Sequence, residues 1–291
     1  MNNKLVICGY GWLGRYLGEA MSATHSIIAT TRSEEKAQQI SDTHIQGLVF
    51  SLGNDTTTLC NELSNATLVL NIPPGRRNTQ LDGFTNSMLA LIDNAVAANV
   101  ARIIFISTTS VYGDARNDEL NEHASTQPEN ASAKAHVAIE QHLLDLKADA
   151  KVDVKIVRLA GLTGPDRHPV SSLSGRSLNA GNKRINLVHI HDVVAALKTL
   201  ILADSTKTDS SKADSSNGDT SKADSADLYH LCSLQHPKRG EYYTQAAHQK
   251  GIPAPTFSES DLAPTGKVID AKASWDLLGI VPNYANPNDM I

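Results

Sequence analysis

Long hydrophobic runs are absent from this chain: none of its 291 residues belongs to an apolar stretch of 18 residues or more. The sequence therefore predicts no membrane-spanning helix. The N-terminal apolar run is also short, because glycines and then Arg15 interrupt it, and it predicts no signal peptide. We expect a cytoplasmic protein that has no membrane partner.

Cysteine and net charge are also low. Cys8, Cys60 and Cys232 are scattered without a paired spacing, which is typical of buried thiols in a reducing compartment. A formal net charge of -5 provides no basic surface suited to nucleic acid. The length of the chain fits one large α/β domain with a smaller appendage.

A glycine-rich turn near the N-terminus is the strongest motif that the sequence does contain. The apolar run Lys4–Cys8 predicts a strand, Gly9-x-Gly11-x-x-Gly14 follows it, and a helix is expected from Trp12 to Ser22. In such a turn the first glycine adopts angles closed to other residues, the second lets a pyrophosphate approach the main chain, and the third lets helix and strand pack closely. A second strand at 26–30 completes the βαβ unit that dinucleotide binding requires. The predicted phosphate cradle comprises Gly9, Tyr10, Gly11, Trp12, Leu13 and Gly14; the alternative is a purely structural turn.

The end of the second predicted strand indicates which dinucleotide binds. An NAD-preferring fold usually has Asp or Glu there, whereas this chain reads Thr31-Arg32-Ser33 and has no carboxylate before Glu34. Arg32 is suited to pair with a 2′-phosphate, while Thr31 and Ser33 can donate hydrogen bonds to it. NADP is therefore the predicted cofactor and NAD the second choice. The alternative interpretation makes Arg32 a solvated loop residue.

Short apolar strands alternate with helices along the first half of the chain, which is typical of a parallel sheet covered on both faces. Strands are predicted near 47–50, 67–71 and 102–107, and helices near 33–40, 55–63 and 81–99. The predicted fold class is α/β, a Rossmann-type doubly wound parallel sheet with a small C-terminal substrate lobe. Ile72 and Pro73 lie where such sheets bind ligands, and we expect them to form a wall beside the cofactor. The alternative is a rigid turn that only ends the strand.

Several later segments carry recognisable patterns. The run Phe105-Ile-Ser-Thr-Thr-Ser-Val-Tyr-Gly113 is similar to the Ser-Ser-x-x-Val-Tyr-Gly signature of extended short-chain dehydrogenases, the superfamily of nucleotide-sugar epimerases and dehydratases. Arg158–Pro165, Asn186–Val193 and Leu277–Ile280 resemble further segments of that family, so the resemblance covers most of the chain. It implies a nicotinamide cofactor, hydride transfer and a small-molecule substrate.

Catalysis in that family uses a Ser or Thr hydroxyl to polarise the substrate oxygen, and a tyrosine whose pKa is lowered by a lysine four residues later. The resemblance places the polarising hydroxyl at Thr108. Counting back from Glu140 places Ser132 and His136 at the tyrosine and lysine positions. The chain thus resembles an atypical branch that lacks the Tyr-x-x-x-Lys pair.

A second register does not restore the pair, because anchoring on Lys134 places Asn130 at the tyrosine position. Tyr112 and His136 are then the candidates for proton transfer, together with a water held by Ser132. The alternative is that Tyr112 packs in its loop and His136 is a solvated helix residue. Thr108, Tyr112, Ser132 and His136 are accordingly the predicted catalytic residues.

The second half of the chain contains fewer regular elements. Residues 161–181 resemble the loop region that closes over substrate in the family. Their Arg167 and Arg176 are suited to an anionic group, and the alternative is that both are solvated loop charges. The pattern His189-x-His191-Asp192 consists of metal-ligand types, but Asp192 is expected to be the N-cap of a helix over 193–202, so no metal is predicted. Further elements are expected at 228–233, 241–250 and 271–278.

Residues 204–227 differ in composition from the rest, because they contain almost no large apolar side chains and repeat Ser-Lys-Ala-Asp-Ser. This pattern predicts a disordered insertion. The predicted domains are a cofactor domain, 1–160 completed by 186–203 and 228–234, and a substrate lobe, 161–185 with 235–291. The predicted function is an NADP-dependent oxidoreductase or epimerase, monomeric or homodimeric, for a small polar or sugar-derived substrate; the alternative is an inactive cofactor-sensing protein.

Overall fold

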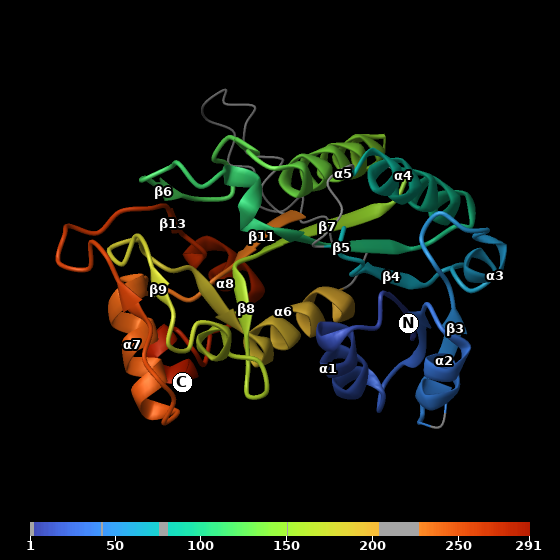
Figure 1. The fold of residues 1–291 in the computed structure, drawn as a ribbon. Helices are drawn as coiled ribbons and strands as arrows, with labels where there is room; N and C mark the ends of the chain where they lie inside the picture. The colour runs from blue at the N-terminus through green and yellow to red at the C-terminus, as the bar shows by residue number, and fades with distance from the viewer. Residues whose placement is uncertain (1–2, 42, 76–80, 150, 204–226) are drawn as a thin grey trace. The chain divides into compact units, whose positions relative to one another are not determined.

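Seven strands form one sheet in the order β11-β7-β5-β4-β1-β2-β3 (Figure 1). The computed structural model describes residues 3–41, 43–75, 81–149, 151–203 and 227–291. The strands are β1 Lys4–Cys8, β2 Ser26–Thr31, β3 Gln46–Val49, β4 Thr67–Leu70, β5 Arg102–Thr108, β7 Asp153–Leu159 and β11 Leu228–Leu231. The pairs β1–β2, β2–β3, β1–β4 and β4–β5 are parallel. The order reverses between β1 and β4, which creates the switch point of a doubly wound sheet and confirms the predicted fold class.

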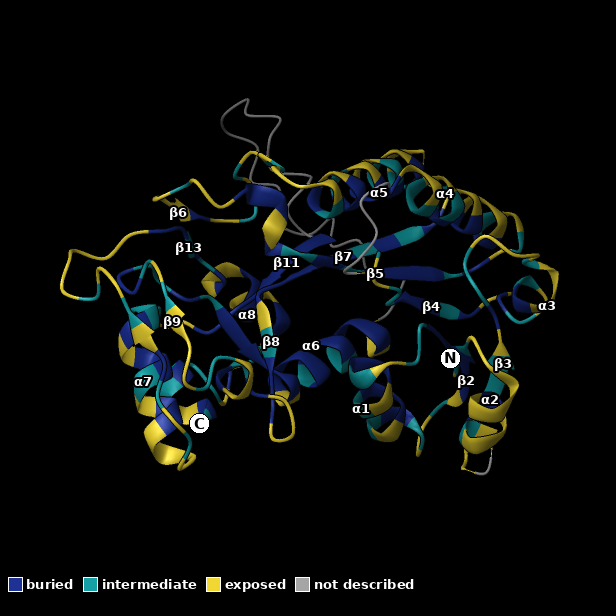
Figure 2. Ribbon diagram, in the orientation of Figure 1, coloured by how far each residue is buried: buried dark blue, intermediate teal, exposed yellow. Residues whose placement is uncertain are grey.

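Helices bury the sheet because its strands are apolar on both sides. Alternate strand residues such as Val6, Leu68 and Phe105 pack under α4 (Asp82–Ala97) and α5 (Ala131–Ala148) in one continuous core. The intervening residues, among them Ile7, are buried as well, and α1 (Trp12–Met21) lies on that opposite face (Figure 1). Figure 2 shows dark blue strands beneath helices α4 and α5 whose outer sides are yellow. This pattern is the one expected of a parallel sheet.

Two helices of the first half are α2 (Glu34–Ser41) and α3 (Thr57–Cys60). The helix predicted over 55–63 ends early, because the amides of Glu62 and Leu63 bond three residues back, to Leu59 and Cys60, in tight turns. Cys60 is half-buried, which corrects the expectation that it is buried, while Cys8 and Cys232 are buried. Within the described part of the chain, no helix combines the length and hydropathy needed to cross a membrane.

The chain divides into two compact units. Unit 1 comprises residues 1–107, 128–157 and 197–228, and unit 2 comprises 108–127, 158–196 and 229–291. The elements not yet given are β6 Glu119–Leu120, β8 Gly161–Thr163, β9 Ser177–Leu178, β10 Leu187–His189, α6 Ile190–Leu202, α7 Arg239–Gln249, β12 Thr256–Phe257, β13 Val268–Ile269 and α8 Lys272–Leu278. Unit 2 has its own core, in which Tyr242 and Ala246 of α7 pack with Val170 and Leu187. The predicted division into a cofactor domain and a substrate lobe separates the chain by role, whereas these two units are separated by compactness. That division stays a prediction.

The insertion predicted at 204–227 lies outside the described residues, apart from its last residue. Asp227 is buried, and its carboxylate accepts a hydrogen bond from Lys155 Nζ at 2.5 Å. The elements on either side, α6 and β11, agree with the predicted helix and strand at these positions.

Asp192 does not cap a helix, which corrects the prediction. Helix α6 begins at Ile190, directly after β10, so that Asp192 belongs to its first turn. The Asp192 carboxylate instead accepts the backbone N–H groups of Asn283 at 2.9 Å and Tyr284 at 3.0 Å. A buried carboxylate is thereby satisfied, and the C-terminal segment is attached to the start of α6.

Candidate functional site

A cleft of about 1200 Å³ opens in unit 1 at the switch point of the sheet. It is formed by the loops that follow β1, β2, β3 and β4, together with the start of α4. Its volume exceeds the roughly 300–1,000 Å³ of ordinary small-molecule sites, so it suits an extended ligand of dinucleotide size. Eight residues predicted to bind the cofactor line this cleft: Gly9, Tyr10, Gly11, Thr31, Arg32, Ser33, Ile72 and Pro73.

Gly9 is required by the geometry of the turn after β1. Its φ is +98°, and a Cβ at this position would lie 2.5 Å from the carbonyl oxygen of Asn71. Asn71 Nδ2 also donates a hydrogen bond to the Gly9 carbonyl at 3.0 Å, and Gly9 N donates to Thr30 Oγ1 of β2 at 2.9 Å. The loops after β1 and β4 therefore touch through their backbones, which only glycine allows here.

The rest of the glycine motif leaves room for an anion. A Cβ on Gly11 would meet no atom within 4 Å, whereas one on Gly14 would lie 3.1 Å from the Gly9 carbonyl oxygen. Gly11 is the N-cap of α1 and, among the described residues, no side chain caps this helix end. The turn thus presents open space and helix N–H groups, which suit a pyrophosphate. Gly14, Trp12 and Leu13 form the first helical turn behind the cleft lining.

Two cations are the charged residues in the described lining of the cleft, Arg32 and Lys36. Arg32 is exposed, and no described carboxylate forms an ion pair with it. Ser33 Oγ accepts the Lys36 backbone N–H at 3.3 Å, so Ser33 caps α2 while its hydroxyl proton can still be donated. This end of the cleft is therefore positively charged.

Part of this lining lies outside the residues predicted to bind the cofactor. Lys36 is one such residue, although its position four residues after Arg32 on a predicted helix indicates that the two side chains are neighbours. Asn71 was treated only as the end of a strand. No sequence signal singles out the apolar and hydroxyl groups that complete the cleft: Phe50, Ser51, Leu52, Phe84 and Ser87.

Ser132 and His136 lie one turn apart at the beginning of α5. His136 is buried, stacks on Phe105 with ring centroids 5.8 Å apart, and directs Nδ1 to the Ser132 carbonyl oxygen at 2.7 Å. Burial lowers the pKa of His136, and its bond to Ser132 and the nearby Glu140 oppose this only in part. The ring is therefore neutral at physiological pH, and Nδ1 is the protonated nitrogen. The interpretation of His136 as a solvated residue does not fit this burial.

A second contact fixes the same helix. Ser107, the penultimate residue of β5, donates a short hydrogen bond to the carboxylate of Glu140 on α5, and both residues are buried. Glu140 is the residue that anchored the sequence register, and Ser107 was not selected from the sequence. This bond couples the end of β5 to α5, where Ser132 and His136 lie.

Thr108 is half-buried, ends β5 and is the first residue that belongs to unit 2. Its Oγ1 accepts the Ser110 backbone N–H at 3.2 Å and lies 3.1 Å from Ser110 Oγ. The hydroxyl thus caps the short 3-10 helix Thr109–Tyr112. Its proposed polarising role rests on the family resemblance.

Tyr112 is fully buried inside unit 2 and its hydroxyl is saturated. The oxygen accepts a hydrogen bond from Arg158 Nη1 at 2.6 Å and lies 2.5 Å from His230 Nε2. His230 Nδ1 in turn lies 2.8 Å from the Asp270 carbonyl oxygen, and burial lowers the pKa of His230. A neutral His230 therefore donates from Nδ1 to the Asp270 carbonyl and accepts a hydrogen bond from the Tyr112 hydroxyl at Nε2. This satisfied chain supports a structural role for Tyr112, and its catalytic role stays a prediction.

The other charged and histidine residues that the sequence singles out in unit 2 lie in a loop, at the end of β10 and in α6. His168 is buried and contacts the Tyr242 hydroxyl at 2.8 Å, while Arg176 is exposed. His189 stacks on Tyr284 at 3.6 Å between ring centroids, and His191 packs edge-on against His189 at 4.7 Å. Among the described residues there is no cluster of three or more His, Cys, Asp or Glu side chains placed to hold a metal. These histidines are packing groups.

Comparison with known proteins agrees with this architecture. Residues 5–211 match the NAD dependent epimerase/dehydratase family. The chain is 30% identical over 289 residues to Protein YeeZ of Escherichia coli K12, covering 98% of this chain and 97% of that protein. Among solved structures, MoeE5 in complex with UDP-glucose and NAD has a TM-score of 0.74 at 19% identity, covering 99% of this chain and 95% of MoeE5.

UDP-glucuronic acid 4-epimerase from Bacillus cereus, in complex with NAD, has a TM-score of 0.75 at 14% identity. The alignment covers 99% of this chain and 95% of the epimerase. Similarity at this level of identity reflects a shared fold. The family match and the full-length relative go further, and the chain belongs to the NAD dependent epimerase/dehydratase family.

Proposed function

We propose that this protein is an NADP(H)-dependent oxidoreductase or epimerase. The observation that carries the proposal is the charge of the cleft: Arg32 and Lys36 are its charged lining residues, and the described residues place no carboxylate at the end of β2. An NAD-preferring site uses a carboxylate there for the ribose hydroxyls. A 2′-phosphate matches this cationic end instead.

The residues of unit 1 fit a dinucleotide in the remaining contacts too. The open backbone at Gly11 and the amino end of α1 would hold the pyrophosphate, and Ile72 and Pro73 would border the apolar part of the ligand. When bound, a nicotinamide cofactor supplies hydride transfer. The protein's own contribution is to orient the cofactor and to move a proton.

The proposed substrate is a small polar carbonyl or hydroxyl compound of the sugar-derivative class. Structurally similar proteins are described in complex with UDP-glucose or as acting on UDP-glucuronic acid. Thr108 is the proposed hydroxyl that polarises the substrate oxygen. His136, or a water held by Ser132, is the proposed proton carrier, because Tyr112 has its hydrogen-bonding groups engaged within unit 2.

A second candidate function is cofactor sensing without turnover. It is favoured by the missing Tyr-x-x-x-Lys pair and by the burial of His136, whose Nδ1 is engaged by the Ser132 carbonyl. Such a protein would bind the cofactor in the cleft without catalysing a reaction.

The cofactor proposal is tested by titrating NADPH and NADH into the wild-type protein and Arg32→Glu. Loss of one charge-assisted phosphate contact should weaken NADPH binding roughly tenfold to a hundredfold. NADH binding should not weaken, because the new carboxylate can accept hydrogen bonds from the ribose hydroxyls. Equal affinities in the wild type would contradict the NADP preference.

The choice between enzyme and sensor is tested with a panel of aldehydes, ketones and sugar nucleotides. An oxidoreductase should oxidise NADPH with at least one class, whereas an epimerase should convert a sugar nucleotide to its epimer with no net change of the cofactor. Thr108→Val should slow either reaction without weakening cofactor binding. If His136 carries the proton, the rate should follow a protonation below the usual histidine range, because burial lowers its pKa. Absence of turnover with every class, together with tight NADPH binding, supports the sensing function.

A further inference from the structure

Glu140 is a buried carboxylate that lies one helical turn after His136 on α5. Glu140 is 3% exposed, and Ser107, which donates a hydrogen bond to its carboxylate, is also 3% exposed. Residues four apart on a helix have their side chains on one face. On this face of α5, β5 contacts both residues, through the Ser107 hydroxyl at Glu140 and through the Phe105 ring at His136. The end of β5 thus holds the carboxylate and the imidazole on the same side of the helix.

The Glu140 carboxylate also acts on His136 through its charge. Burial lowers the pKa of His136, and among the described residues Glu140 is the one charged group that opposes this effect. The residues of β5 at this point, Phe105 and Ser107, are uncharged. A negative charge beside the buried imidazole therefore comes from Glu140.

The charged residues that the neighbouring elements contribute to unit 1 are either exposed or engaged in ion pairs. The exposed ones are Asp82 and Asp93 of α4 and Lys134 and Asp145 of α5. The paired ones are Arg102 of β5, Asp153 and Lys155 of β7, and Lys147 of α5. Solvent screens the first group, and the charges of the second group are compensated by their partners.

A proton acceptor at position 136 becomes a buried cation. Nδ1 of the neutral ring donates to the Ser132 carbonyl oxygen, so Nε2 is the nitrogen that can take a proton. When a substrate hydroxyl group is oxidised, the hydrogen on its carbon leaves as a hydride to the cofactor, and the hydroxyl proton goes to Nε2. His136 is then an imidazolium in a buried site, where a charge without a counter-charge is unfavourable.

We propose that Glu140 is a positioning residue for proton transfer, which holds α5 on β5 through Ser107 and supplies the counter-charge of the imidazolium form of His136. The inference rests on the proposed role of His136 as the proton carrier. Glu140 acts on the reaction through His136 and not by contact with substrate or cofactor. Ser107 fixes the carboxylate, so that its charge stays beside the ring when the proton arrives.

The test follows the Cε1 proton of His136 by NMR in the cofactor-free protein as pH is varied. Glu140→Gln keeps an oxygen that can accept from Ser107 and removes the charge, so the midpoint of the His136 titration should move about one pH unit lower. Glu140→Asp keeps the charge and should stay closer to the wild type. Asp145→Asn removes an exposed carboxylate of the same helix and is the matched control, which should leave the midpoint unchanged.

A double variant guards against failure of Glu140→Gln to fold. Ser107→Ala with Glu140→Met replaces both buried partners by apolar groups, which is commonly tolerated, and it should lower the His136 midpoint in the same way. With a substrate that is turned over, the acidic limb of the kcat profile should move down by the same amount.

The outcomes separate this inference from the proposed function. An unchanged His136 midpoint in a folded variant without the Glu140 charge overturns the role of Glu140, even if kcat falls. A wild-type protein without turnover, or His136→Ala with full activity, refutes His136 as the proton carrier and with it the part of Glu140 in catalysis. A lowered midpoint together with a lowered kcat limb supports both.

Discussion

At the scale of single residues, the glycines of the cradle have separate tasks. Gly9 is needed for the backbone, since it combines a φ of +98° with the close approach of Asn71. Gly11 is needed for the ligand, since the space beside it is empty of protein atoms within 4 Å. The two positions therefore allow stability and binding to be measured independently.

Gly9→Ala should lower the thermal midpoint of unfolding, because a left-handed conformation costs an alanine about 1–2 kcal/mol and its methyl group would overlap the Asn71 carbonyl. Gly11→Ala should leave the midpoint of the cofactor-free protein unchanged and weaken NADPH binding roughly tenfold, since its methyl group enters the phosphate space. Thermal denaturation measures the midpoint of unfolding of both variants, and calorimetry measures their NADPH affinity. Equal destabilisation by the two variants would contradict this division of roles.

Buried histidines make stability depend on pH. Burial lowers the pKa of His189 to about 4, and the charge of His191 adds to the effect. Between the usual pKa of about 6.5 and about 4, the unfolded chain binds a proton that the folded chain does not. Stability is therefore complete above this window and falls as pH decreases through it.

His189→Phe should reduce the loss of thermal stability between pH 7 and pH 5, because phenylalanine keeps the stacking on Tyr284 and does not titrate. The reduction is partial, since His168 has its pKa lowered to about 4 by burial in the same direction. Exposed His123→Gln is the control and should leave the pH dependence unchanged. An unaltered pH profile in His189→Phe would be inconsistent with this assignment.

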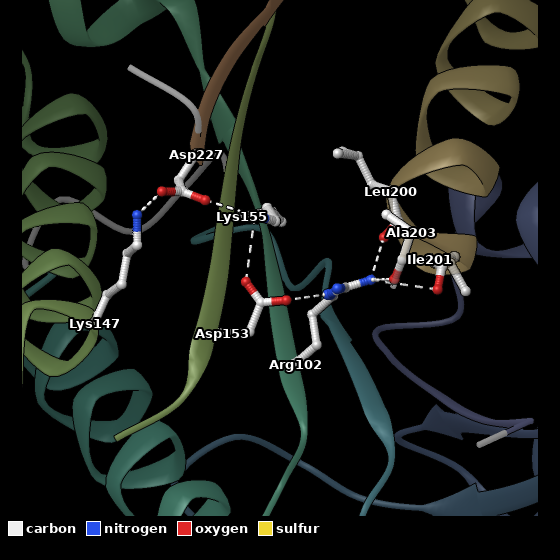
Figure 3. A network of polar contacts seen from close by, with 8 residues as sticks. All are labelled: Arg102, Lys147, Asp153, Lys155, Leu200, Ile201, Ala203 and Asp227. Atoms are coloured by element: carbon white, nitrogen blue, oxygen red, sulfur yellow. Dashed lines mark hydrogen bonds and ion pairs between the residues drawn. The ribbon is translucent and has the colours of Figure 1, made fainter. Parts of the chain in front are cut away.

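At the scale of elements, an ionic network joins β5, β7 and the end of α6 (Figure 3). Arg102 is buried and donates to Asp153 at 2.5 Å and to the carbonyls of Leu200 at 2.6 Å and Ala203 at 2.8 Å. These carbonyls at the last helical turn have no partner within the helix itself. Arg102 thus serves as the C-terminal cap of α6.

The same network reaches the strand that follows the insertion. Lys155 pairs with Asp153 at 3.3 Å and with Asp227 at 2.5 Å, and Lys147 of α5 makes a further short contact to Asp227 (Figure 3). Ala203 and Asp227 are the described residues that flank the insertion. Both of these flanking residues are therefore held by contacts within unit 1.

Arg102→Gln should destabilise the protein strongly, because it leaves the α6 carbonyls without their cation and Asp153 with Lys155 alone. Loss of one partner from a buried pair costs about 3 kcal/mol or more, which corresponds to roughly 6 °C or more in a unit of this size. Lys272→Gln breaks an exposed pair with Asp276 and should change the midpoint by less than about 1–2 °C. Thermal denaturation of both variants in parallel distinguishes a cap from a surface ion pair.

At the scale of the whole molecule, the elements on either side of the predicted insertion are anchored within unit 1 by their own contacts. Residues 204–226 lie outside the described structure, and their composition offers no core-forming side chains. Loop length contributes to closure entropy only logarithmically.

Replacing residues 205–226 with a few glycines should therefore leave the thermal midpoint within about 2 °C of the full chain and leave NADPH affinity unchanged. Limited proteolysis of the full chain should cleave first within this segment. An unfolded deletion variant, or a segment resistant to protease, would overturn the insertion hypothesis.

The sequence by itself determined the fold class and the position of the glycine-rich turn after β1. Short apolar strands, the helices between them and the glycine spacing are local properties, and they reach the same answer in the structure because each acts within a few residues. The resemblance carried by Phe105–Gly113 and the later segments identified the family for the same reason.

The tertiary structure decided the roles of individual polar groups. Tyr112 meets His230 across 118 residues of chain, and Asp192 meets Asn283 across 91. Lys36 lines the cleft only because α2 packs beside the β1–α1 turn. Glycine is required at position 9 because the Asn71 carbonyl oxygen lies close to it, and this closeness arises only when β4 pairs with β1. Hydrogen bonding and burial depend on which distant segments come into contact, and a pattern of neighbouring residue types does not contain that information.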